Sequence, residues 1–115
     1  MGFFSWLARK GVAGETARTI GQQYLMLKAR GSADSETGDE EIFETILAAR
    51  HAAKPYTLTE LARLQSSAVY SESVADFVLG VVLAESNVGP SELPEGQMNN
   101  LREAITRELR GLGLS

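Results

Sequence analysis

The chain has 115 residues, of which 43% are hydrophobic and 23% are charged, enough for one hydrophobic core and too few for two. It contains no cysteine, and this excludes disulfides, thiol catalysis and sites built on thiolate ligands. The formal net charge of −4 disfavours a general nucleic-acid binder, because phosphate contacts need a basic surface.

Residues 1–14 are predicted to form an apolar and basic segment ahead of a single helical domain over residues 15–115. Gly11 and Gly14 would each cost about 1 kcal/mol inside a helix, so we expect a short separate helix hinged near residues 11–14. The segment combines four large apolar side chains with two cations: Phe3, Phe4, Trp6, Leu7, Arg9 and Lys10. The cations follow the apolar stretch, whereas they precede it in a signal peptide, and a cytoplasmic location is expected.

The spacing of apolar residues predicts a helix over residues 15–30 that ends at Gly31. Its apolar face is Ala17, Ile20, Tyr24 and Leu27. Residues 31–39 are rich in Gly, Ser and Asp and predict a loop.

A second helix is predicted from the capping box Thr37–Glu40 to the residue before Pro55. Its expected buried side is Ile42, Phe43, Ile46, Leu47, Ala49 and Ala53. Glu40, Glu41 and Glu44 lie in or near its first turn, where carboxylates complement the positive helix end. The sequence has no Glu-x-x-His pair of the kind that bundle metal sites use, so a structural role is favoured for these acids.

A capping box at Thr57–Glu60 predicts a third helix. Its expected buried side is Leu58, Leu61, Ala62, Leu64 and Ala68. A fourth helix, capped by Ser71 or Ser73, is predicted to run to about Glu85. It is apolar nearly all round, and this places it at the centre of the bundle. Its valines also fit a strand, but no partner strand is apparent.

A loop over residues 86–96 precedes a last helix that ends at Gly111. The apolar face of that helix is Met98, Leu101, Ile105 and Leu109. The prediction is therefore an all-α, single-domain bundle of about five helices with a short amphipathic N-terminal segment.

No catalytic constellation is present in the sequence, and no enzyme activity, cofactor or metal is expected. The one histidine, His51, stands beside Arg50 near a helix C-terminus, where positive charge is favoured. The segment Leu58–Val82 resembles a helix-turn-helix in its opening residues. Its second helix offers acids and valines instead of a basic reading surface, which makes DNA binding the least favoured alternative.

The leading functional hypothesis is a non-catalytic interaction module, or a small accessory subunit of a larger assembly, with another protein as partner. The N-terminal residues Phe3 to Lys10 are the candidate binding segment. Alternatively, these residues pack into the core of the domain, or they bind an anionic membrane surface and attach the protein to it peripherally. Association with a second copy of the chain also stays open, because the apolar fourth helix suits either a monomer or a dimer.

Overall fold

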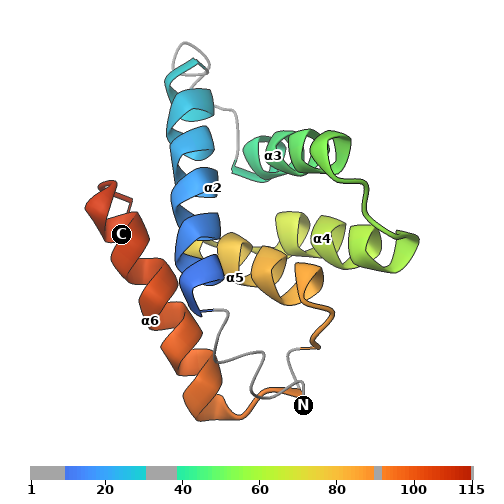
Figure 1. Ribbon diagram of the computed structural model, residues 1–115. Coiled ribbons are helices and arrows are strands. Elements are labelled where there is room, and N and C mark those ends of the chain that lie inside the picture. The colour runs from blue at the N-terminus through green and yellow to red at the C-terminus, as the bar shows by residue number, and fades with distance from the viewer. Residues whose placement is uncertain (1–9, 31–38, 90–91, 115) are drawn as a thin grey trace.

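The computed structural model describes residues 10–30, 39–89 and 92–114 of the chain (Figure 1). Over these ranges the chain is all-helical, with five helices and no strand, which confirms the predicted fold class. The helices are α2 (Lys10–Arg30), α3 (Asp39–Ala53), α4 (Leu58–Tyr70), α5 (Val74–Glu85) and α6 (Glu95–Gly111). None of them has both the length and the apolar character that crossing a membrane requires.

Helix α5 lies at the centre of the bundle, as predicted. It packs against α2, α4 and α6, and eight of its twelve residues are buried. Helices α2 and α6 lie side by side and both run upward in Figure 1. Helices α3 and α4 run antiparallel on the other side of α2.

The core is mostly aliphatic but has a stacked aromatic pair within it. The rings of Phe43 in α3 and Phe77 in α5 have no exposed surface, and their centroids lie 4.2 Å apart with planes only 10° from parallel. Tyr24 of α2 lies 6.2 Å from Phe43. Because the three rings come from three helices, this cluster joins α2, α3 and α5.

The predicted break at residues 11–14 is wrong, because α2 is continuous from Lys10. The reason is its close packing on α6. A Cβ atom on Gly14 would make an ordinary contact with Glu108 Cγ at 3.4 Å, whereas one on Gly21 would lie only 2.7 Å from Leu112 Cδ1. Gly21 therefore lets the two helices approach, and the packing of α2 on α6 offsets the low helix propensity of its glycines.

Four apolar residues predicted to face the core are exposed instead: Ala49, Ala53, Leu58 and Ala62. At the end of α3 it is Arg50 that points inward, and its guanidinium donates a hydrogen bond to the carboxylate of Glu85 in α5. Leu58 is the first residue of α4 and 87% of its surface is exposed, so α4 buries a narrower face than its pattern indicates.

The helix starts follow the predicted capping chemistry where the structure describes them. The Thr57 hydroxyl accepts from the Glu60 amide at 3.1 Å, and the Glu60 carboxylate accepts from the Thr57 amide at 2.9 Å. Ser73 caps α5 by accepting from the Asp76 amide at 3.2 Å. The Thr37 end of the other predicted capping box lies outside the described residues.

Candidate functional site

A hollow surface runs along the junction of α4 and α5. It consists of two adjacent hollows of about 470 and 410 Å³. We call the pair the α4–α5 groove. Both hollows are lined by Ser66, Ser67, Gly80 and Leu83. The first continues over Ala62, Arg63, Ala84, Val88 and Gly89. The second continues over Tyr70, Ser71, Asp76, Leu79, Met98 and Arg102.

Small residues form the middle of the groove, where α4 and α5 cross closely. A Cβ atom on Gly80 would clash with Ser67, lying 2.8 Å from its Cβ. Only glycine therefore fits at this crossing without a shift of one helix. The result is a shallow centre with larger apolar side chains on either side, a shape that suits a segment laid along the two helices.

Exposed apolar side chains continue the groove at the end of α4. Tyr70, which lines it, is 79% exposed, and the neighbouring Val69 is 48% exposed. Single exposed apolar residues are ordinary on a protein surface. Apolar residues that adjoin a hollow with an apolar lining are instead typical of a binding surface.

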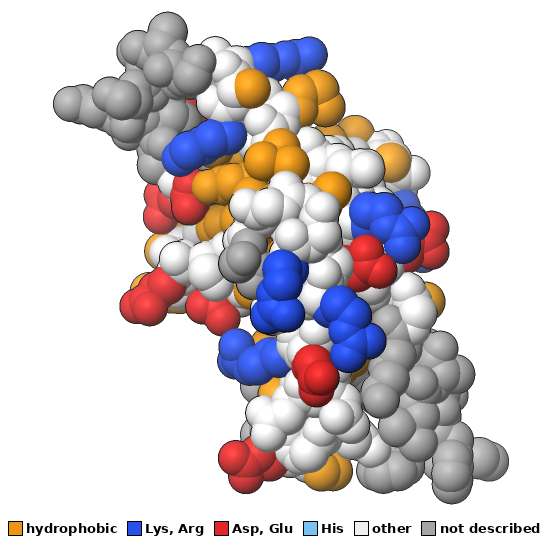
Figure 2. Space-filling model, turned by 90° about the vertical axis from the view of Figure 1, so that its left-hand side faces the viewer, with side chains coloured by type: hydrophobic (Ala, Val, Ile, Leu, Met, Phe, Trp, Pro, Cys, Tyr) orange, Lys and Arg blue, Asp and Glu red, His pale blue; other side chains and the backbone are white. Residues whose placement is uncertain are grey.

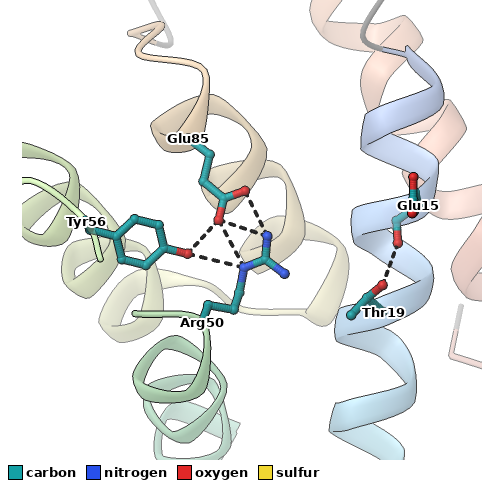
Figure 3. A network of polar contacts seen from close by, with 5 residues as sticks. All are labelled: Glu15, Thr19, Arg50, Tyr56 and Glu85. Atoms are coloured by element: carbon teal, nitrogen blue, oxygen red, sulfur yellow. Dashed lines mark hydrogen bonds and ion pairs between the residues drawn. The ribbon is translucent and has the colours of Figure 1, made fainter. Parts of the chain in front are cut away.

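A second feature is a polar network that ties α3, α5 and the connection between α3 and α4 (Figure 3). Arg50 Nη2 donates to both carboxylate oxygens of Glu85, at 2.8 and 2.9 Å, and Arg50 Nε donates to one of them at 3.0 Å. The Tyr56 hydroxyl donates to Glu85 Oε2 at 2.5 Å and accepts from Arg50 Nε at 3.2 Å. We interpret this network as a structural brace, because its three side chains use their hydrogen-bonding groups on one another.

The brace borders a cavity of about 300 Å³ that Lys54, Pro55 and Glu60 also line. Burial, and then the hydrogen bond to Glu85, raise the pKa of Tyr56 to about 12 despite the opposing effect of Arg50. Burial lowers the pKa of Arg50, but the charge of Glu85 and their hydrogen bond outweigh this and raise it overall. The cavity is therefore bordered by the Arg50–Glu85 salt bridge and by a phenol that keeps its proton at neutral pH.

The raised pKa of Tyr56 predicts a loss of stability at high pH. An unfolded tyrosine ionises near pH 10, whereas Tyr56 holds its proton to about pH 12. Its contribution is thus complete below pH 10 and is lost as the pH rises to about 12. Because Tyr56 is partly exposed, we discount the full shift and expect a loss of about 1 kcal/mol.

Urea unfolding of wild type and Tyr56→Phe, followed across that pH range, measures this loss. The variant should lose less free energy of unfolding than wild type does, since phenylalanine cannot ionise. Parallel losses in both proteins would show that Tyr56 makes no contribution.

The residues that the sequence offered as candidates for catalysis or metal binding have structural roles on or near α3. His51 is half-buried, its Nδ1 accepts from the Tyr56 amide at 3.1 Å, and its ring stacks on that of Tyr56. Glu40, Glu41 and Glu44 are exposed on α3. No group of three or more histidine, aspartate or glutamate side chains in the described ranges is placed to hold a metal ion.

The predicted binding segment lies mainly outside the described residues. This applies to Phe3, Phe4, Trp6, Leu7 and Arg9, whereas Lys10 is the first residue of α2. The structure therefore gives no contact for these side chains, and their role remains a prediction.

Figure 2 shows basic side chains spread over the face to which α6 contributes, with acidic side chains between them. Arg102 bonds to Asp76 at 3.1 Å, and Arg107 bonds to Glu103 at 3.4 Å. Arg18 of α2 reaches Glu108 at 3.4 Å. Because a carboxylate accompanies each of these arginines, the face has mixed charge and lacks the uniformly basic character of a nucleic-acid interface.

Comparison with protein-family models, with curated proteins and with solved structures gives no match for this chain. The argument for function therefore rests on the geometry of its own residues.

Sequence analysis missed both the groove and the brace. The signals for the groove were Val69 and Tyr70, exposed apolar residues that do not share a helix face with buried Leu64 and Ala68. The signal for the brace was Glu85, an acid that ends an otherwise apolar helix. Neither pattern identifies its partner, because the contacts join residues far apart in the sequence.

Proposed function

We propose that this protein is a non-catalytic interaction module, in which the α4–α5 groove binds an apolar segment of a partner protein. The observation that carries the proposal is the groove itself. Its small central residues, Ser66, Ser67 and Gly80, let a partner backbone come close, and Leu79, Leu83 and Val88 offer apolar contact. Such a surface is typical of grooves that receive an amphipathic segment.

The charges around the groove indicate the chemistry of the partner segment. Asp76 lines the groove, and Glu92 accepts from the amide of Gly89 at its other end. Glu72, which is exposed, follows the lining residue Ser71 in the chain. Two arginines, Arg63 and Arg102, line the groove, and Arg102 is already paired with Asp76. The groove therefore has mixed charge, and apolar contact is the main requirement on the partner segment.

The energy for such binding comes from apolar burial. Each large apolar side chain that a partner buries contributes roughly 1.5–3 kcal/mol before the costs of association. Two or three such side chains suit the reversible binding of an adaptor or accessory subunit.

The variant Ser66→Arg tests the proposal, because Ser66 is exposed on α4 and lines both hollows. Peptides that bind the full-length protein would first be selected from a displayed library, and their affinities would then be measured by fluorescence polarisation. We expect the selected peptides to be apolar and to bind Ser66→Arg at least about tenfold more weakly than wild type, a change of about 1.4 kcal/mol.

Gln65→Arg is the matched control. It places the same charge on the neighbouring exposed residue of α4, which does not line the groove, and it should leave affinity nearly unchanged. Selected peptides that bind Ser66→Arg and wild type equally well would contradict the proposal.

A further inference from the structure

The start of α2 and one end of the α4–α5 groove both lie along helix α6. Helices α2 and α6 are parallel (Figure 1), and the Cβ position of Gly14 is 3.4 Å from Glu108 Cγ. Lys10 lies one turn before Gly14, and therefore beside the turn of α6 that precedes Glu108, near residue 104. From there Met98, which lines the groove, is six residues away, or roughly 9 Å along the helix axis.

Only Ala8 and Arg9 connect the segment Phe3–Leu7 to α2. With this connection extended, Leu7 can lie up to about 10 Å from Lys10, a distance similar to the axial separation. The groove hollow nearest to Met98 is also the one that Leu79 and Tyr70 line, so a segment that arrives along α6 would meet apolar side chains at this end.

The chemistry of that segment matches the partner inferred above. Phe3, Phe4, Trp6 and Leu7 supply large apolar side chains, and Arg9 adds a cation. At the same end of the groove, Asp76 lines the hollow and the exposed Glu72 follows the lining residue Ser71 in the chain. The point of departure beside α6 and the apolar character of the segment therefore favour it as the occupant.

We propose that the N-terminal segment Phe3–Leu7 occupies the α4–α5 groove of its own chain and competes there with the partner segment. This inference rests on the proposed function for the partner, but occupation by the chain itself can be tested separately. It assigns the apolar N-terminus a regulatory role, because binding of a partner then requires its displacement. Only molecules whose groove is free can bind a partner, so the apparent affinity for the partner is the intrinsic affinity multiplied by the fraction of free grooves.

Trp6 is the only tryptophan, and its fluorescence tests occupation in the full-length protein. In the monomer we expect emission at short wavelength and slow quenching by acrylamide. Ser66→Arg should shift the emission to longer wavelength and speed the quenching, with unchanged far-ultraviolet circular dichroism. Gln65→Arg should behave as wild type does.

Three results would overturn occupation of the chain's own groove. Emission typical of water in the wild-type monomer would show an exposed segment, and vesicles of anionic phosphatidylglycerol that then shift it would indicate a membrane site. Short-wavelength emission unchanged by Ser66→Arg would place Trp6 elsewhere in the core. Emission that shifts on dilution, together with a dimer in light scattering, would assign the groove to the segment of a second copy.

The double variant Phe3→Ser/Phe4→Ser separates this inference from the proposed function. If the segment competes, the variant should bind the selected peptides at least about tenfold more tightly than wild type. Unchanged affinity would contradict competition and leave peptide binding in the groove intact. If Ser66→Arg bound the selected peptides as tightly as wild type but still shifted the Trp6 emission, only the proposed binding of a partner would be contradicted.

Discussion

Phe77→Ala is expected to lower the free energy of unfolding by about 3–5 kcal/mol. The Phe77 ring is fully buried and stacks on Phe43 at 4.2 Å, so its removal creates a cavity and ends an aromatic contact between α5 and α3. Because small domains are stable by only about 5–15 kcal/mol, this is a large part of the total. Urea unfolding followed by circular dichroism measures the change.

Two comparisons control this result. Phe77→Leu keeps most of the volume and should cost less, roughly 1–2 kcal/mol. Leu58→Ala removes an apolar side chain that is 87% exposed and should change stability by no more than about 0.5 kcal/mol. Equal effects of Phe77→Ala and Leu58→Ala would show that Phe77 does not belong to the core.

Glu85→Gln is expected to destabilise the protein by about 1–3 kcal/mol. The substitution keeps the shape of the side chain but removes the charge that faces the Arg50 guanidinium. The two side chains are only 27% and 22% exposed, so water compensates poorly for the lost partner. The Tyr56 hydroxyl also loses a charged acceptor.

Glu103→Gln is the matched control, because Glu103 pairs with Arg107 on the surface of α6. These side chains are 69% and 76% exposed, and pairs of this kind contribute about 0–1 kcal/mol. Urea unfolding of Glu85→Gln, Arg50→Met and Arg50→Met/Glu85→Gln gives the coupling energy between Arg50 and Glu85, and Glu103→Gln is measured beside them. A Glu85→Gln effect as small as that of Glu103→Gln would show that the brace does not stabilise the fold.

Local patterns in the sequence were sufficient to predict most of the fold. The capping residues Thr57 and Ser73 and the apolar spacing of α6 depend on neighbours within a few positions, so they can be read without tertiary contacts. The continuous apolar surface of α5 likewise predicted its central position. These features were confirmed because propensity, capping and burial all agree there.

Predictions failed where long-range packing overrides local preference. Gly14 was interpreted as a hinge from its helix propensity, but it lies within the continuous helix α2, which packs on α6. Arg50 was interpreted as a cation at a helix end, and its carboxylate partner is 35 residues away. The groove arises from the crossing of α4 and α5 at Gly80, a geometry that spacing along the chain does not encode.

The most direct test of the α4–α5 groove as a binding site is a chemical-shift map. Full-length, ¹⁵N-labelled protein would be titrated with a peptide selected for binding, and amide shifts would be followed by two-dimensional NMR. We predict the largest shifts at the residues that line both hollows, Ser66, Ser67, Gly80 and Leu83. Shifts centred on the Arg50–Glu85 cavity or on the exposed face of α6 would contradict the assignment of the groove.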